Sequence, residues 1–142
     1  MKLTRYSDYA LRVSIYLAMF PDRLVSIPEI VKAYEMPHSN MLKLATDLVG
    51  AGFVVSVRGR SGGLRLAMPP EQITLGQIVR HTEGVQPLVD CTGCVLLPDC
   101  ALIGILQEAR DAMFAVLDRH TLAQFAGTGP KALQHLFTVT DT

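Results

Sequence analysis

Apolar residues recur every three to four positions over most of this chain, which is the spacing of amphipathic helices. In the first third of the sequence this pattern predicts three helices, over residues 7–20, 26–36 and 38–49. Ser7 can cap the first helix, and Ser26 with Glu29 forms a capping box at the start of the second. Two helices joined by a short turn are the layout of a helix-turn-helix, or of an ordinary helical hairpin.

The spacing changes to that of strands after the third helix. Residues 53–57 and 64–67 predict two strands, joined by the basic turn Arg58-Gly59-Arg60-Ser61-Gly62-Gly63. Guanidinium groups beside glycines suit contact with phosphates or a minor groove, as in a wing. The competing interpretation, a nucleotide-phosphate cradle, lacks the Walker and dinucleotide-binding glycine patterns. The sequence therefore predicts a mainly α fold with a small β-hairpin wing, a winged helix-turn-helix.

Helical spacing returns in the second half. A helix is predicted from Thr74 to about Thr82, a long one from residue 100 to about 119 with Asp99 as its cap, and a short one over 122–125. The long helix has a sustained apolar stripe that the winged part is too small to cover: Leu102, Ile105, Leu106, Ala109, Met113, Val116 and Leu117. We expect this helix to dimerise; packing within one chain is the alternative.

These elements divide the chain into four parts. We expect a winged helix-turn-helix DNA-binding domain over 1–68, and a connecting helix with a cysteine loop over 69–99. A dimerisation helix with a short following helix is expected over 100–126, and a flexible tail over 127–142.

Charge is divided in the same way, although the net charge of the chain is zero. Residues 1–67 contain nine Lys and Arg against five Asp and Glu, a net charge of +4, and residues 68–142 contain four against eight, a net charge of −4. Contact with a polyanion is therefore assigned to the first half.

All three cysteines, Cys91, Cys94 and Cys100, lie within ten consecutive positions. Thiolates at this spacing can converge on one soft metal, although zinc and iron–sulfur sites use four ligands and a fourth must come from elsewhere. A disulfide with a leftover thiol, as in a redox switch, is the second interpretation, and simple packing is the third.

The remaining composition narrows the class of protein. No run approaches the ~18 apolar residues of a membrane span. An odd number of cysteines without an export signal indicates a reducing cytoplasm. The four histidines are scattered and no local Ser/His/Asp set is present, so a catalytic role has no support and we expect no enzyme.

With these motifs the chain resembles the Rrf-type winged-helix regulators. The segments that carry the resemblance are Leu3 to Arg12, Ser26 to Ile30, Leu48 to Gly52, Ser56 to Gly63 and Cys94 to Cys100. The resemblance implies a homodimeric cytoplasmic repressor that binds a double-stranded DNA operator. It also implies an iron–sulfur cluster, 4Fe-4S favoured over 2Fe-2S, on Cys91, Cys94 and Cys100.

The same resemblance supplies a fourth ligand. Some members use a histidine shortly after the third cysteine, where this chain has Ile103; the nitric-oxide-sensing members use an aspartate in the first helix of the other subunit, and Asp8 stands at that position. The resemblance thus implies Asp8 of the partner subunit as the ligand and nitric oxide as the signal. The short gap between Cys91 and Cys94 leaves an iron-availability or redox sensor as an alternative. A small dithiol redox protein with a protein-binding winged domain is the alternative from another class.

On the DNA-binding hypothesis, three parts of the winged domain contact the operator. The third helix meets the major groove, the wing reaches the minor groove or its phosphates, and the first helix lies near the DNA backbone. The residues assigned to these contacts are Ser39, Asn40 and Lys43, then Arg58, Gly59, Arg60, Ser61 and Gly62, and finally Tyr9 and Arg12.

Overall fold

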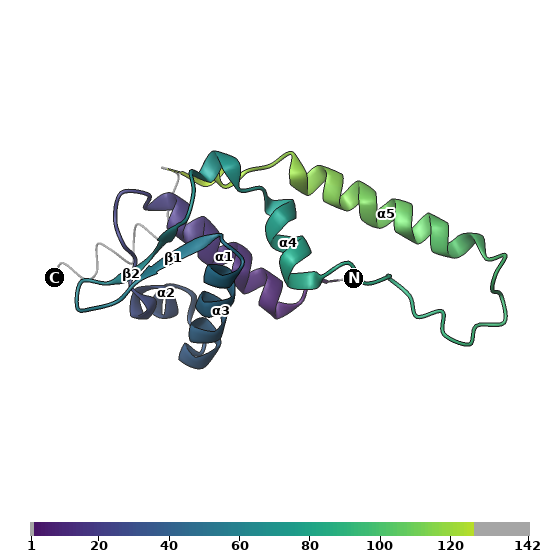
Figure 1. The fold of residues 1–142 in the computed structure, drawn as a ribbon, viewed down its shortest axis with the longest axis horizontal. Coiled ribbons are helices and arrows are strands. Elements are labelled where there is room, and N and C mark those ends of the chain that lie inside the picture. Colours follow the sequence, from purple (N-terminus) through teal and green to yellow (C-terminus); the bar gives the residue numbers. More distant parts are fainter. Residues whose placement is uncertain (1, 127–142) are drawn as a thin grey trace.

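Helices make up most of residues 2–126, the part of the chain that the computed structural model describes. The elements in chain order are α1 (Arg5–Met19), α2 (Ile27–Tyr34), α3 (His38–Gly50), β1 (Val54–Val57), β2 (Gly63–Leu66), η1 (Pro70–Gln72), α4 (Leu75–Glu83), α5 (Ala101–Asp118) and η2 (Leu122–Phe125) (Figure 1). The predicted fold, mainly α with a β-hairpin wing, is confirmed. The tail predicted over 127–142 lies outside the described residues.

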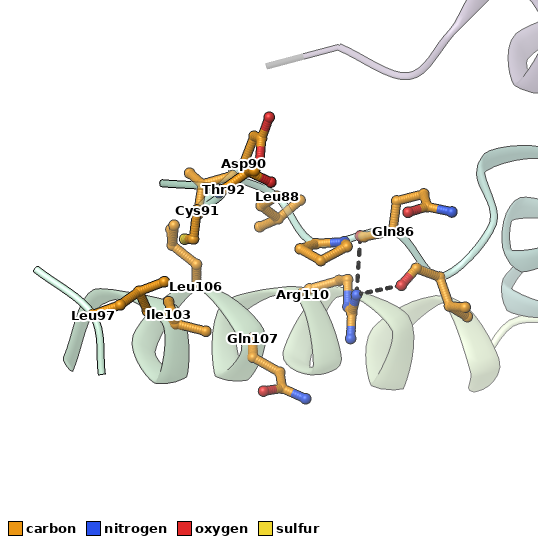
Figure 2. Close-up of a pocket in the computed structure, with 13 residues that line it drawn as sticks. Gln86, Leu88, Asp90, Cys91, Thr92, Leu97, Ile103, Leu106, Gln107 and Arg110 are labelled. Atoms are coloured by element: carbon orange, nitrogen blue, oxygen red, sulfur yellow. Dashed lines mark hydrogen bonds between the residues drawn. The ribbon is translucent and has the colours of Figure 1, made fainter. Parts of the chain in front are cut away.

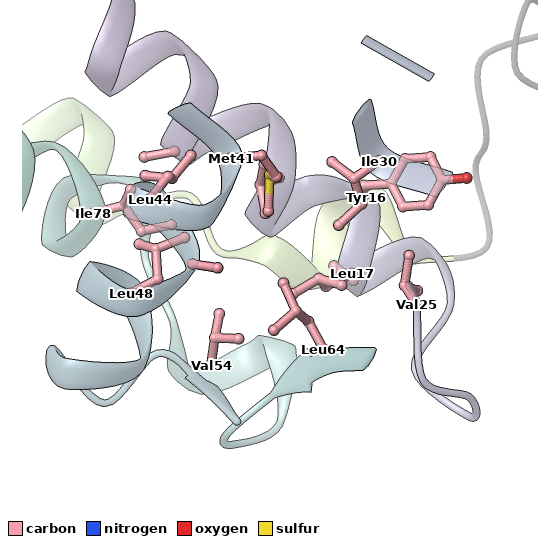
Figure 3. Close-up of a cluster of buried hydrophobic side chains, with 14 of the residues drawn as sticks. Tyr16, Leu17, Val25, Ile30, Met41, Leu44, Leu48, Val54, Leu64 and Ile78 are labelled. Atoms are coloured by element: carbon pink, nitrogen blue, oxygen red, sulfur yellow. The ribbon is translucent and has the colours of Figure 1, made fainter. Parts of the chain in front are cut away.

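One apolar core holds α1, α2, α3 and the hairpin together (Figure 3). Met41, Leu44 and Leu48 recur at helical spacing on α3, and each is at most 1% exposed. Burying a side chain of this size stabilises the fold by roughly 1.5–3 kcal/mol. Residues after the hairpin complete the same core, among them Ile73, Ile78 and Leu122. The division of the chain at residue 68 stays a prediction.

The hairpin is fixed at its base by the segment before α2. β1 and β2 pair antiparallel, with Val54 opposite Leu66. Leu64 also exchanges backbone hydrogen bonds with Val25, at 2.8 and 2.9 Å. Gly63 passes so close to this segment that a Cβ there would lie 2.5 Å from the Val25 carbonyl oxygen. A glycine is therefore needed where the return strand meets Val25.

Two of the predicted helix caps are wrong. Thr4 caps α1, because its side chain accepts a 3.1 Å hydrogen bond from the Ser7 backbone N–H, and Ser7 itself lies fully buried inside the first turn. α5 begins one residue later than predicted, so Cys100 occupies the N-cap position and makes no side-chain cap bond. Asp99 is one position too far from the helix to cap it.

The predicted capping box of α2 forms only in part. Ser26 accepts a 3.3 Å hydrogen bond from the Glu29 backbone N–H, as a cap should. The Glu29 side chain accepts from Tyr16 at 2.8 Å and from Arg23 at 2.6 and 2.9 Å instead of returning to the cap. Glu29 therefore links the start of α2 to α1 and to the connecting turn.

α5 projects away from the helices of the core; the loop 84–100 runs outward from α4 along one side of α5, and α5 then returns toward the core (Figure 1). Phe114 is its one buried residue, whereas Leu102, Ile105 and Val116 are 50%, 59% and 45% exposed. We call residues 2–68 the winged region and residues 84–118 the arm. None of the helices within 2–126 combines the length and apolarity that crossing a bilayer requires.

Candidate nucleic-acid interface and metal centre

The outward face of α3 is polar. Ser39, Asn40 and Lys43 are exposed, on the side opposite the buried Met41 and Leu44. They line an open surface groove together with Leu42, Thr46 and Asp47. Short hydrogen-bonding groups and an ammonium on one helix face can contact base edges and phosphates.

The wing tip presents two guanidinium groups on a tight turn. Arg58, Gly59, Arg60 and Ser61 are exposed, and neither arginine forms an ion pair with any residue of the described part of the chain. Gly59 has a φ of +116°, which strongly favours glycine. Its carbonyl accepts a 3.0 Å bond from the Gly62 N–H. Two unpaired guanidinium groups on a fixed turn can bind an anionic backbone.

On α1, Asp8 and Arg12 pair with each other. The Arg12 Nε–H donates to Asp8 Oδ1 at 2.7 Å, with the side chains 54% and 48% exposed respectively. The hydrogen bond to Asp8 raises the pKa of Arg12 above its usual value. Tyr34 donates to the Arg12 carbonyl at 2.9 Å, and Tyr9 is half-buried against the core. Asp8 is accessible to a second partner, because about half of its side chain faces solvent.

The cysteine loop is held mainly by short-range bonds. Thr92 donates its N–H to the Asp90 carboxylate at 2.9 Å, and the Cys94 N–H donates to the Cys91 carbonyl at 3.1 Å. All three cysteines are free thiols; Cys94 is exposed, and Cys91 and Cys100 are half-buried. Three free thiols on one open loop are a donor set that fits a soft metal or an iron–sulfur cluster.

The structure does not assemble that metal site within one chain. Between residues 2 and 126, no three side chains of His, Cys, Asp or Glu converge as a metal site. Asp8 lies on α1, and the cysteines lie in the segment between α4 and α5. Asp8 and the three cysteines are therefore not brought together within one chain.

A cavity of about 840 Å³ separates the loop from α5 (Figure 2). Cys91 points toward Leu106 on the helix, while Asp90 points away from it. Arg110 donates two 3.0 Å hydrogen bonds from the helix to the carbonyls of Val85 and Gln86. The first residues of the loop are therefore tied to α5.

Asp47 is a residue whose role the sequence did not reveal. Its spacing on α3 predicts an outward side chain, yet the Tyr6 O–H donates to one carboxylate oxygen, and His81 Nε2 lies 3.0 Å from the other. Burial raises the pKa of Asp47, but the bonds from Tyr6 and His81 lower it more, so it falls below its usual value. Burial and the bond to Asp47 raise the pKa of Tyr6 to about 12. No local signal could have found this cluster, since the partners lie 34 and 41 residues away.

A second cluster joins the ends of α1 and α4. Glu83 Oε1 accepts from the Thr4 N–H at 2.8 Å, the Thr4 hydroxyl at 2.9 Å and the Ser7 hydroxyl at 2.5 Å. Thr82 shares a 2.6 Å hydrogen bond with Ser7. Burial raises the pKa of Glu83, but the bonds from Ser7 and Thr4 lower it more, so its pKa falls below the usual value. The carboxylate therefore keeps its charge at a lower pH than an ordinary glutamate does. The last turn of α4 is therefore bonded to the first turn of α1.

The other face of α4 is joined to α5. Arg80 forms a bidentate ion pair with Asp118, at 2.6 and 2.7 Å, and its guanidinium lies 4.6 Å from the centre of the Phe114 ring. The bonds from Arg80 lower the pKa of Asp118. Gly76 leaves no room at the crossing, because a Cβ there would lie 1.8 Å from an Asp118 oxygen. This joint sets the direction in which α5 leaves the winged region.

Residues 3–128 match the protein family described as Rrf2, iron-dependent transcriptional regulator. The NsrR transcriptional regulator of Bacillus subtilis strain 168 is 43% identical over 128 residues, which are 86% of this chain and 88% of that protein. NsrR of Halalkalibacterium halodurans is 39% identical over the same shares of the two chains.

Solved structures of the same architecture include two regulators. CymR of Bacillus subtilis, titled the global cysteine regulator, aligns with a TM-score of 0.75 at 30% identity, over 89% of this chain and 98% of that one. IscR of T. potens aligns with a TM-score of 0.71 at 27% identity, over 87% of this chain and 84% of that one.

Proposed function

The chain belongs to the Rrf2 family of iron-dependent transcriptional regulators, and from this premise we propose a repressor whose operator binding is controlled by an iron–sulfur cluster that reacts with nitric oxide. The observation that carries the proposal is the set of three free cysteines on one open loop, in a chain about 40% identical to NsrR regulators. The family and the names of these relatives indicate a DNA-binding transcriptional regulator rather than an enzyme.

In this proposal the winged region binds the operator. The exposed face of α3 enters the major groove with Ser39, Asn40 and Lys43, and the wing places Arg58 and Arg60 against the minor groove or its phosphates. Gly59, Ser61 and Gly62 shape that turn, while Tyr9 and Arg12 support α1 near the DNA backbone. The support is the exposure of these side chains and the net charge of +4 on residues 1–67.

Cys91, Cys94 and Cys100 would hold the cluster, with 4Fe-4S favoured over 2Fe-2S. The fourth ligand would be Asp8 of the partner subunit, which fits a side chain that is about half exposed and outside the reach of the chain's own cysteines. A bound cluster would supply iron that reacts with nitric oxide. This ligand set would join α1 of one subunit to the arm of the other, so a reaction at the cluster would change how the two are held together.

A homodimer in the cytoplasm follows from the same proposal. Leu102, Ile105 and Val116 form an exposed apolar stripe on α5, and Val95 and Leu96 of the loop are also 94% and 61% exposed. Exposed large apolar side chains in such number are typical of an interface. A second copy of the arm would cover it with matching residues under two-fold symmetry.

The test is an anaerobic gel shift with and without a nitric oxide donor. Wild-type protein with its cluster should bind the operator and release it when the donor is added. Asp8→Ala should still assemble a cluster but lose operator affinity or the donor response, and Cys94→Ala should lose the cluster. Asp22→Ala removes a carboxylate from an exposed turn and is the matched control. Identical spectra and identical donor-sensitive binding in wild type and Asp8→Ala would contradict the role of Asp8.

Redox or iron-availability sensing is the second candidate. It is favoured by the likeness to CymR, because the Staphylococcus aureus protein, 29% identical to this chain with a TM-score of 0.73, is titled as an oxidized form. Free Cys91 and Cys94, close in sequence, could pair as a disulfide. An absorption spectrum and native mass of anaerobically purified protein separate a cluster from a dithiol or a disulfide. Family membership favours either kind of regulator over a small dithiol redox protein.

A further inference from the structure

α4 is bonded to α1, α3 and α5, the helices through which a change at the cysteine loop would have to reach the DNA-binding surface. His81 bonds to Asp47 of α3, Glu83 bonds to the start of α1, and Arg80 pairs with Asp118 at the end of α5. The chain then passes directly from Glu83 into the cysteine loop. A helix bonded to both the candidate DNA-binding surface and the arm can transmit a change between them.

We propose that Asp47 is a positioning residue that couples the α3 helix to the cysteine loop through His81 and α4. This inference rests on the proposed function, because it concerns how the state of the loop reaches the helix that contacts DNA. Asp47 itself need not touch the operator to act in this way.

The geometry of Asp47 supports the coupling. One of its carboxylate oxygens accepts from Tyr6 of α1, and the other lies 3.0 Å from His81 of α4. Ser39, Asn40 and the rest of the candidate DNA face lie on the same helix. Hydrogen bonds are directional, so a displacement of α4 acts on Asp47 more specifically than sliding apolar contacts would. The orientation of α3 therefore depends on where α4 stands.

His81 extends the same contact to the base of the wing. Its ring lies edge-on to Phe53, with 6.0 Å between the ring centres. Phe53 directly precedes β1, and its N–H donates to the Leu48 carbonyl of α3 at 3.1 Å. A movement of His81 would therefore be felt by both of the surfaces proposed to bind DNA.

On the other side, the entry to the loop is held from two directions. The Gly84 N–H donates to the Arg80 carbonyl at 2.9 Å, which closes α4. Arg110 holds the next two residues, Val85 and Gln86, against α5. Cys91 follows after four more residues. Only the short segment 84–90 connects Cys91 to the last turn of α4, so a change in the position of Cys91 can displace that turn.

The test uses the reciprocity of coupling: if the loop biases α3, then DNA bound at α3 changes the loop. A duplex is first selected from a random pool by the cluster-loaded protein. The full chain, reduced and without a cluster, is then mixed with that duplex at concentrations high enough to saturate binding. The alkylation rates of the three cysteines by a maleimide are measured with and without that duplex. We expect the duplex to change the rate at Cys91 or Cys100 by roughly fivefold or more in wild type.

Three variants test whether the coupling passes through the contact between His81 and Asp47. Asp47→Ala and His81→Phe should reduce that change to less than about twofold, whereas Asp47→Asn, which keeps a hydrogen-bond acceptor, should retain part of it. Phe at position 81 preserves the ring contact with Phe53 and removes only the bond to Asp47. Arg23→Gln is the control, because it breaks a comparably exposed ion pair, with Glu29, that touches neither α4 nor the loop.

The outcomes separate this inference from the proposed function. Equal changes in wild type, Asp47→Ala and His81→Phe would overturn the route, and so would a wild-type protein that binds the duplex with unchanged thiol rates. Failure of the cluster-loaded protein to select any duplex would contradict the proposed function instead. A double-mutant cycle on the melting temperature then decides the contact itself: non-additive effects of Asp47→Ala and His81→Phe support it, and additive effects overturn it.

Discussion

The winged region and the arm bury their apolar residues to very different extents. In the winged region Tyr16, Leu44 and Leu48 are at most 1% exposed, whereas in the arm Ile105 is 59% and Val95 94% exposed. The winged region therefore obtains its shape from contacts within the chain. The arm leaves several large apolar side chains exposed within one chain, and the proposed dimer would cover them.

Polar bonds differ between the two regions in the same way. Long-range side-chain bonds fasten the winged region to α4, as between Asp47 and His81 or between Ser7 and Glu83. The cysteine loop is bonded mostly to itself over two or three residues. Local bonds of this kind hold a turn but not its position relative to the rest of the molecule. This difference suits the proposed roles, in which the winged region binds DNA and the cysteine loop of the arm responds to the signal.

Deleting core atoms should have the largest effect, and only in the winged region. Leu48→Ala should lower the free energy of unfolding by about 2–5 kcal/mol, because it leaves a cavity among fully buried neighbours. Val95→Ala, at a side chain 94% exposed, should change it by no more than about 0.5 kcal/mol. Urea denaturation measures both. Similar losses at the two positions would remove the contrast between the regions.

Placing a charge on the exposed stripe of α5 should come next. Ile105→Asp should weaken self-association about 100-fold or more, because a carboxylate would be buried without a partner in the interface. Ala115→Asp puts the same charge on an exposed position away from the stripe and should leave association unchanged. Sedimentation equilibrium distinguishes the two variants. If Ile105→Asp associated like wild type, α5 would not be the dimer interface.

Removing one arginine from each region should have a smaller effect. Arg58→Ala should weaken operator binding by about 1–3 kcal/mol if the guanidinium enters a groove, and flatten the salt dependence by about one unit if it contacts a phosphate. Arg119→Ala removes the same charge from just beyond α5 and should change neither quantity. Fluorescence anisotropy at several salt concentrations provides the comparison. Wild-type affinity and salt slope in Arg58→Ala would show that the wing does not bind DNA.

The smallest effect should come from acid, through the polar clusters on α4. The pKa of Glu83 in the folded protein lies below its ordinary value of 4.5. The stabilisation from the ionised Glu83 is therefore fully present above pH 4.5 and is lost as the pH falls further. The melting temperature should therefore be nearly constant from pH 7 to about pH 5 and then decline. Glu83→Gln should have a lower melting temperature at pH 7 and a shallower decline. A decline as steep as that of wild type would exclude Glu83.

The elements of the fold could be predicted because they depend on local patterns. The spacing of Met41, Leu44 and Leu48 predicts α3, and the glycines between Arg58 and Leu64 predict the turn. The caps were less predictable, since Thr4, Ser7 and Asp99 are all suitable residues and the choice depends on where each helix meets its neighbours. Thr4 caps α1 while also bonding to Glu83, 79 residues away.

The candidate site could be predicted only where its residues are close in sequence. The cysteines share ten positions, and the wing arginines share one turn, so both groups are visible as motifs. Asp47 and His81 belong to different helices, and no spacing rule connects them. The fourth ligand of the metal site came from the resemblance to a family and stays a prediction. Residues of two subunits have no common pattern in one sequence.

The close crossing at Gly76 makes α5 a lever. At 1.5 Å per residue, the 18 residues of α5 extend roughly 27 Å from that crossing to the cysteine loop. A rotation of only about 10° at the joint would carry the far end through roughly 5 Å, close to the pitch of one helical turn. The absence of a side chain at position 76 thus permits the close crossing of α4 and α5, and a small change in the angle of that crossing would displace the far end of α5 most.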